Sequence, residues 1–295
     1  MTTAANTQSK SDIYTDITRQ IIEAIENGTA THNLPWQGVS GLPLNVASKR
    51  SYRGINTLLL WLIGNRKGYT TPYWATFRQW LELGHPVRKG EKSATVVFWK
   101  QLAGSSGEDQ SEPEAAENRG PVVARAYHVF NAAQVEGYIA PEITPLSETE
   151  RDARAEAFFA GLPIRIEHGG TEAYYAPKAD SVHLPEYRVF KDAEAYYSTL
   201  GHECVHATGA KHRLDRDLSG RFGSEAYAME ELVAELGAAY LCADLTLSKQ
   251  PRLDHAGYIE SWLKVLKGDP RAIFTAAGKA QAAVDWLRGP KGTAP

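Results

Sequence analysis

His202-Glu203-Cys204-Val205-His206 is the stretch of this sequence that decides the fold and the chemistry of its second half. The two histidines are four residues apart, so on a helix their imidazoles share one face and can bind the same metal ion. Glu203 follows the first histidine and is placed to act as the general base for a metal-bound water. The pattern predicts a divalent-metal site of the kind found in zinc-dependent hydrolases. Its structural alternative is a pair of buried, hydrogen-bonded histidines on an amphipathic helix.

The residues around this motif predict a helix over residues 192–206. Apolar side chains recur at close to a helical period, at Ala193, Tyr196, Tyr197, Leu200, Cys204 and Val205. Gly209 then provides a helix stop. Cys204 faces away from the ligand side of this helix, so we interpret it as a small core residue and not as a thiolate ligand.

A third protein ligand is expected, because catalytic zinc usually takes three protein ligands and one water. The next helix-forming stretch, residues 227–239, is rich in Ala, Leu and Glu. Glu231 and Glu235 lie one turn apart on one face of that helix. One of them is therefore the candidate third ligand, and the other can orient a ligand histidine from behind. Glu230 is a weaker candidate, because adjacent helix positions point about 100° apart.

This half of the sequence resembles the gluzincin-type metallopeptidases, in which H-E-x-x-H is followed by a glutamate on the next helix. The pattern E-x-x-A-E-x-x-A that begins at Glu231 is also similar to the ligand helix of the ImmA/IrrE-like peptidases. The resemblance implies that His202, His206 and Glu231 bind the metal, with Glu235 behind them or as the alternative ligand. His212 is the metzincin-like alternative ligand, because His206, Gly209 and His212 have the spacing H-x-x-G-x-x-H, but the resemblance of the next helix favours Glu231. Two imidazoles and a carboxylate favour Zn²⁺, although Mn²⁺ or another divalent metal can occupy such a site.

The composition is that of an ordinary globular protein. Of its 295 residues, 43% are hydrophobic and 23% charged, and this length leaves room for two domains. No apolar run approaches about 18 residues, so we expect no membrane partner. The polar start of the chain lacks the apolar segment of a secretory signal. With only two cysteines, a reducing cytoplasmic location is expected.

Charge divides the chain into two unlike parts. Residues 1–100 hold 12 Lys and Arg against 6 Asp and Glu, and residues 101–295 hold 20 against 29. A basic module suited to a polyanion is thus followed by an acidic module with another task. We predict an α+β fold of two domains, residues 12–140 and residues 148–290. The first is α+β, and the second is mainly helical with a small sheet.

Periodicity and turn residues place the secondary structure of both modules. In the first, we predict helices at 12–27, at 56–62 and from 75 or 76 to 83, an irregular segment at 29–50, and strands at 94–100 and 122–130. These two strands are expected to pair as a hairpin across the acidic stretch 103–120. In the second, we predict helices at 148–161, 192–206, 227–239, 256–267 and 269–288, and short strands near 163–167, 173–175 and 181–184.

Aromatic side chains alternate with basic and amide side chains in the first module. Aromatic faces stack on unpaired bases and cations follow the phosphates, so this mixture suits single-stranded nucleic acid better than a duplex. The structural alternative is that the aromatic residues are core and the cations are a solvated face. The candidate DNA-binding residues are Asn45, Tyr52, Arg53, Asn56, Tyr73, Trp74, Gln79, Lys89 and Lys92.

The same stretches closely resemble the N-terminal domain of the ArdC-type antirestriction proteins of conjugative plasmids. They are G-L-P-L-N from residue 41, S-Y-R-G-I-N from residue 51, Y-W-A-T-F-R-Q-W from residue 73 and V-R-K-G-E-K from residue 87. That family joins this domain to a metallopeptidase-like domain, so the resemblance covers residues 12–288. It implies non-specific binding of single-stranded DNA and protection of incoming plasmid DNA against host restriction.

Three functions follow as alternatives. The first is an antirestriction protein with a metal-dependent peptidase site, whose target is a host restriction component or a DNA-bound protein. The second is a DNA-binding shield whose metal site is structural and not proteolytic. The third is a general protease with an incidental basic domain.

Overall fold

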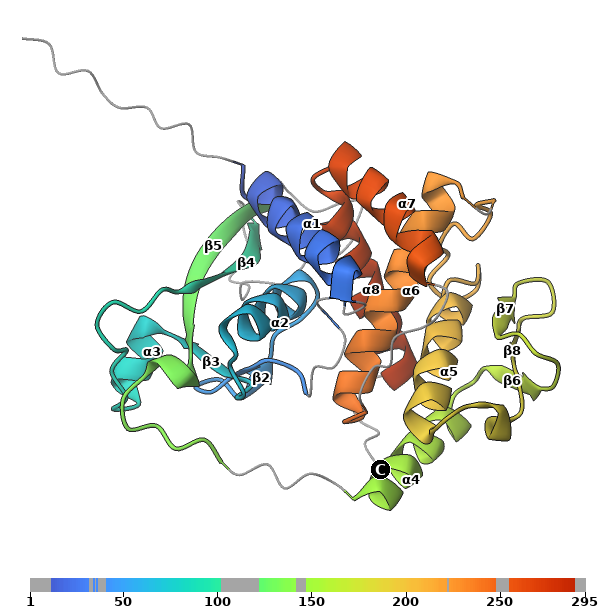
Figure 1. Ribbon diagram of the computed structural model, residues 1–295, viewed down its shortest axis with the longest axis horizontal. Helices are drawn as coiled ribbons and strands as arrows, with labels where there is room; N and C mark the ends of the chain where they lie inside the picture. The colour runs from blue at the N-terminus through green and yellow to red at the C-terminus, as the bar shows by residue number, and fades with distance from the viewer. Residues whose placement is uncertain are drawn as a thin grey trace, which may run out of the picture.

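The computed structural model describes residues 12–31, 34, 36, 41–101, 122–141, 147–221, 223–247 and 255–289. Figure 1 shows a half with a five-stranded sheet beside a mainly helical half with a small second sheet. The two-part α+β architecture predicted from the sequence is therefore confirmed. Within the described residues, every helix is too short or too polar to cross a bilayer.

The first half alternates helices with the strands of one mixed sheet. Its elements are α1 (Ile13–Thr31), β1 (Leu44–Asn45), β2 (Arg50–Ser51), α2 (Ile55–Lys67), β3 (Tyr73–Thr76), α3 (Phe77–Glu82), β4 (Ala94–Gln101), β5 (Val122–Asn131) and a 3₁₀ turn at Ala132–Gln134. The strand order is β2-β1-β3-β5-β4, and only β1 and β3 run parallel. Strands β4 and β5 form the predicted hairpin, with Ala94 opposite Val129 and Gln101 opposite Val122. The acidic stretch 103–120 lies outside the described residues.

The sequence did not predict the three short strands of this sheet. Residues 75 and 76, expected to begin a helix, instead end β3, and the helix begins at Phe77. Thr76 caps that helix, because its hydroxyl accepts from the Gln79 N–H while the Gln79 side chain accepts from the Thr76 N–H. Strands β1 and β2 lie in or beside the segment expected to be irregular, and two residues are too few to show alternation.

The second half is built from helices packed around α6. Its elements are α4 (Glu148–Ala160), β6 (Arg165–His168), β7 (Tyr174–Ala176), β8 (Ser181–Leu184), a 3₁₀ turn at Tyr187–Val189, α5 (Ala193–Thr208), α6 (Glu225–Asp244), α7 (His255–Gly268) and α8 (Ala272–Arg288). The small sheet has the order β6-β8-β7, so β7 is an edge strand. Each predicted helix and strand of this half is present, with boundaries shifted by a few residues.

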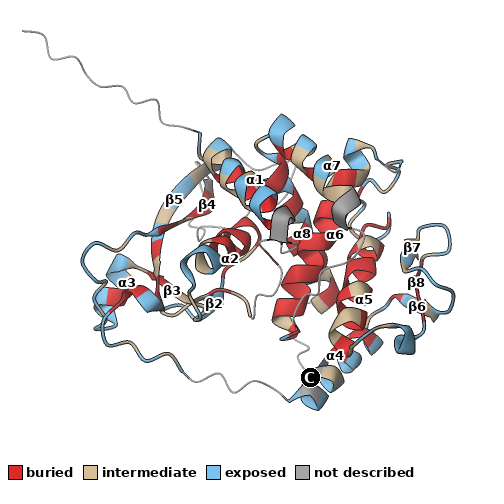
Figure 2. Cartoon of the chain, viewed as in Figure 1, coloured by how far each residue is buried: buried red, intermediate tan, exposed pale blue. Residues whose placement is uncertain are grey.

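Helix α6 is buried along almost its whole length (Figure 2). Its small residues let α5 approach closely. A β-carbon placed on Gly237 would lie 2.8 Å from Cγ2 of Val205, a residue of the H-E-x-x-H motif. This contact fixes the separation of the two helices that carry the candidate metal ligands.

The two halves share one apolar core. Ile17, Ile21 and Ile25 of α1 belong to the same cluster of buried side chains as α5, α6 and α8. Trp61 of α2 packs against Tyr240 of α6, with 5.7 Å between ring centroids. Polar contacts add to this interface. Gly54, which caps α2, donates its N–H to Gln281 and accepts a hydrogen bond from Tyr240.

Replacing Gly237 by Ala should lower the free energy of unfolding by about 1–3 kcal/mol, since the added carbon overlaps a stiff β-branched side chain. Thermal or urea unfolding measures the change. Gly201→Ala is the matched control in the same helix pair, because its added carbon would meet Leu241 at 3.5 Å, an ordinary contact. Equal stability of the two variants would contradict a tight contact at Gly237.

Candidate metal centre

Helix α5 positions the two motif histidines. Asp192 caps its first turn through a hydrogen bond from the Ala195 N–H, and the chain stays helical through Thr208. His202 and His206 therefore face the same side, and their Nε2 atoms are 3.1 Å apart. Both side chains are largely buried. Cys204 points into the core and is fully buried, which raises the pKa of its thiol well above its usual range.

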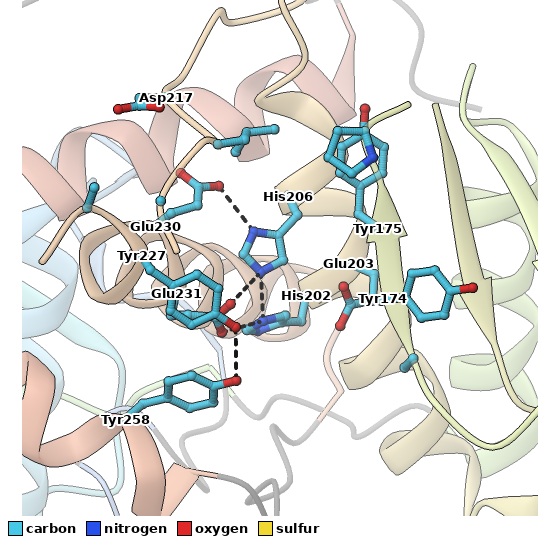
Figure 3. A pocket seen from close by; sticks show the side chains of 15 residues that line it. Tyr174, Tyr175, His202, Glu203, His206, Asp217, Tyr227, Glu230, Glu231 and Tyr258 are labelled. Carbon is cyan, nitrogen blue, oxygen red and sulfur yellow. Dashed lines mark hydrogen bonds and ion pairs between the residues drawn. The ribbon is translucent and has the colours of Figure 1, made fainter. Parts of the chain in front are cut away.

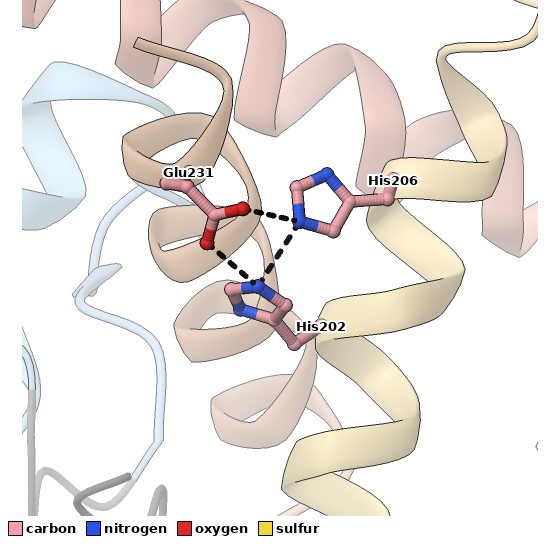
Figure 4. A group of neighbouring side chains, drawn as sticks. All are labelled: His202, His206 and Glu231. Carbon is pink, nitrogen blue, oxygen red and sulfur yellow. Dashed lines mark hydrogen bonds and ion pairs between the residues drawn. The ribbon is translucent and has the colours of Figure 1, made fainter. Parts of the chain in front are cut away.

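Helix α6 supplies the third candidate ligand. The Glu231 carboxylate faces both rings, with Oε2 3.5 Å from Nε2 of His202 and Oε1 3.4 Å from Nε2 of His206 (Figure 4). All three ligand atoms lie within 4.8 Å of one another. Two ligands in tetrahedral positions about 2.0–2.2 Å from zinc are about 3.3–3.6 Å apart. The spacing and the chemistry of this donor set therefore fit a divalent ion.

A carboxylate stands behind each histidine at its other ring nitrogen. Nδ1 of His206 is 3.2 Å from Oε1 of Glu230, and Arg216 donates to both oxygens of the same carboxylate at 2.8 and 3.0 Å. Nδ1 of His202 is 3.7 Å from Oε2 of Glu235. A carboxylate hydrogen-bonded as Glu230 is sets the tautomer and the orientation of a metal-binding imidazole, whereas Glu235 faces His202 at more than hydrogen-bond distance.

Sequence reasoning predicted one such role, for Glu235, and treated Glu230 only as a weaker ligand. The structure instead places Glu230 behind His206. Arg216 was missed, because it lies in the loop between α5 and α6, where no periodicity marks it. His212 lies apart from the group of three ligands and pairs with Asp180 at 3.3 Å.

The charges of the group are strongly coupled. Burial lowers the pKa of His206, but hydrogen bonds to Glu230 and Glu231 outweigh it and raise the pKa from 6.5 to about 10. Burial raises the pKa of Glu231, and its hydrogen bonds to the two histidines reverse this and hold the pKa well below its usual range. The metal-free site thus carries a bound proton on His206 next to ionised carboxylates.

A cavity of about 260 Å³ opens over the three ligands (Figure 3). It is lined by Ala173, Tyr174, Tyr175, Pro177, His202, Glu203, His206, Asp217, Leu218, Gly220, Ala226, Tyr227, Glu230, Glu231 and Tyr258. Glu203, the predicted general base, thus borders the same space as the ligands. The hydroxyl groups of Tyr227 and Tyr258 are 3.2 Å apart on another side of it. Burial and its hydrogen bonds raise the pKa of Tyr227 well above its usual range.

Three of the predicted DNA-binding residues form one hydrogen-bonded group. The amide of Asn45 donates to the Tyr52 hydroxyl at 3.1 Å and to the Gln79 side chain at 3.2 Å. Tyr52 is 7% exposed, and burial raises its pKa to about 12. Because Gln79 also completes the capping box with Thr76, this group ties β1 to the start of α3.

Other candidates are internal. Asn56 is fully buried and bonds to both the N–H and the C=O of Val97, at 2.7 Å each, which joins α2 to β4. Trp74 is buried in the sheet core, and half-buried Tyr73 packs edge-on against Tyr138. Burial removes Tyr52, Asn56 and Trp74 from the surface, so our interpretation of them as DNA contacts is replaced by a structural role.

The charged candidates differ from one another. Arg53 is paired with Asp285 of α8, so its guanidinium joins the two halves. Lys89 and Lys92 are exposed in the turn that follows α3. Among the described residues of this region, Phe77 is an exposed aromatic side chain. It is close in the sequence to the predicted residues Tyr73 and Trp74, but composition alone did not single it out.

A histidine pair on one helix and a glutamate on the next, under an open cavity, define a zincin-like metallopeptidase domain. Residues 153–279 match the zincin-like metallopeptidase family MPTase-PolyVal. Residues 11–130 match the N-terminal domain of anti-restriction factor ArdC. The chain belongs to the ArdC family of antirestriction proteins.

Relatives and solved structures agree with this assignment. An uncharacterized protein of Sinorhizobium fredii, y4eC, is 52% identical, covering 97% of this chain and 95% of that protein. The DNA primase TraC of Escherichia coli is 36% identical over 94% of this chain, which spans only 27% of the primase.

Two crystal structures of the ArdC protein of plasmid R388 cover 94% of this chain and 97% of their own. The metal-free structure is 39% identical with a TM-score of 0.77, and the Mn(II)-bound structure is 38% identical with a TM-score of 0.76.

Metal binding should be coupled to proton release. In the metal-free protein the protonated His206 stabilises the fold fully below pH 6.5, and this contribution is lost as the pH rises through about 10. A metal requires the neutral ring, so its affinity should rise about tenfold per pH unit between about pH 7 and 9. Calorimetric titration with Mn²⁺ in two buffers of different ionisation enthalpy counts the protons. An affinity that does not change with pH would contradict the protonated state of His206.

Proposed function

We propose that this chain is an antirestriction protein that binds single-stranded DNA non-specifically and protects incoming conjugative plasmid DNA from host restriction. Residues 12–140 bind the strand, and residues 148–290 hold a divalent ion, Zn²⁺ or Mn²⁺, in a peptidase-like site. The cytoplasm is where such DNA arrives and where this chain acts. The convergence of His202, His206 and Glu231 under an open cavity, in a chain of the ArdC family, carries this proposal.

The ion, when bound, would polarise a peptide carbonyl and lower the pKa of a water molecule toward neutrality. Glu203 borders the cavity and would accept a proton from that water and donate it to the leaving amine. Tyr227 lines the same cavity, so its hydroxyl could donate a hydrogen bond to the oxyanion. The peptide target is a host restriction component or a protein bound to the entering DNA.

A second function, in which the ion is structural, is supported by the positions of the three ligands. They lie on α5 and α6, which pack closely at Val205 and Gly237, so an ion between them joins the two central helices of the second half. In this alternative the protein is a DNA-binding shield and its ion is structural.

Glu203→Gln separates these two functions. The variant removes the base and leaves all three ligands, so metal affinity should stay unchanged while peptidase turnover falls about 10²–10⁴-fold. Cleavage of purified restriction components and survival of transferred plasmid DNA are the measurements. Glu194→Gln, in the first turn of the same helix, is the matched control. Full protection by Glu203→Gln would favour the structural ion.

The proposed DNA surface centres on α3. Phe77 and Leu81 are one turn apart on this helix and are 54% and 57% exposed. The exposed cations Lys89 and Lys92 follow in the chain. An exposed ring offers a stacking face for a base, and the lysines offer charge for the phosphates. In Figure 1, α3 lies at the end of the molecule remote from the sheet of β6, β7 and β8.

Replacing Phe77 by Ala should weaken binding to a single-stranded oligonucleotide by about tenfold, within the range measured for loss of one stacked base. Fluorescence anisotropy with a labelled oligonucleotide at several salt concentrations measures it. Tyr187→Ala is the matched control, because Tyr187 is 50% exposed but lies in the acidic half. An affinity insensitive to salt would contradict phosphate contacts altogether.

A further inference from the structure

The carboxylates behind the two candidate histidine ligands are held in different ways. Glu230, behind His206, is fixed by Arg216 from the loop between α5 and α6, within the same half of the chain. Glu235, behind His202, accepts a hydrogen bond from Nε1 of Trp36 at 3.1 Å. Trp36 belongs to the first half of the chain and lies inside the part that matches the ArdC N-terminal domain, residues 11–130.

The side chain of Trp36 is fully buried. It is 1% exposed, and its ring packs against Trp262 of α7 with 6.3 Å between centroids. Glu235 is 0% exposed. In such a dry environment a hydrogen bond to a carboxylate is stronger than at the surface, and loss of the donor costs more.

The geometry relates this hydrogen bond to the metal centre. Trp36 binds Oε1 of Glu235, and the other oxygen, Oε2, is the one that faces Nδ1 of His202 at 3.7 Å. Holding Oε1 limits how far the carboxylate can turn, and in this orientation Oε2 is the oxygen that faces His202, at more than hydrogen-bond distance. Nε2 of His202, on the far side of the ring, points to Glu231 and His206.

We propose that Trp36 is a positioning residue for the metal centre. Its indole N–H orients Glu235 toward His202, so that the first half of the chain completes a site whose three ligands all lie in the second half. This inference rests on the divalent-metal site of the proposed function. It implies that metal affinity depends on how the two halves are packed, and by linkage that a bound ion strengthens their contact.

The test is the affinity of the full-length protein for Mn²⁺, measured by calorimetric titration. Trp36→Phe keeps an aromatic ring and removes the N–H, and it should weaken Mn²⁺ binding about tenfold, the lower end of the range for such outer partners. Trp61→Phe is the matched control. Trp61 is also buried in the interface between the halves and donates its N–H to a backbone carbonyl, that of Gly41, at 3.1 Å.

Three outcomes are distinct. If the unmodified protein binds no Mn²⁺ or Zn²⁺, the proposed metal site itself fails. If it binds and both tryptophan variants weaken binding equally, the effect is general loosening of the interface and the role of Trp36 is refuted. A loss confined to Trp36→Phe supports it.

A double-mutant cycle with Glu235→Ala tests whether Trp36 acts through Glu235. In the Glu235→Ala background, Trp36→Phe should have no further effect on Mn²⁺ affinity. The visible absorption of the Co²⁺-loaded protein is a second readout, since it reports the ligand geometry at His202 independently of stability. An unchanged Co²⁺ spectrum in Trp36→Phe, or additive losses of affinity in the cycle, would overturn the proposal.

Discussion

The contact between α5 and α6 at Val205 and Gly237 is the constraint on which the rest of the second half depends. The histidines lie on one helix and the glutamate on the other, so the spacing of the helices sets the ligand distances of 3.4 and 3.5 Å. A larger residue at position 237 would separate them. The absence of a side chain at one position therefore matters as much to the site as the presence of its ligands.

Charge in this buried region is balanced by pairing and not by solvent. Glu230 is ionised next to Arg216 and His206, and Glu231 is ionised next to both histidines. Removing one partner would leave a buried charge without compensation, which is more costly than the pair itself. This dependence explains why residues from the loop after α5, and from the first half of the chain, converge behind the ligands.

The sequence identified site residues best where those residues recur at helical spacing. His202, His206 and Glu231 could be read from helical spacing together with the resemblance to known peptidases, and the structure brings them together. Arg216 could not, because it lies in the loop between α5 and α6, where no periodicity marks it. Trp36 could not, because it is 199 residues from Glu235 in the sequence.

In the first half, composition did not distinguish exposed from buried aromatic residues. Trp74 and Tyr52 are internal, whereas Phe77 in the same stretch is half exposed. Burial depends on strand pairing, which the two-residue strands β1 and β2 do not reveal in the sequence.

The continuous core also means that neither half is complete without the other. Helix α1 of the first half and α5, α6 and α8 of the second contribute to one cluster of buried side chains, so separating the halves would expose apolar faces on both fragments. Similarity to the much longer TraC primase likewise extends over 94% of this chain and not over one half alone.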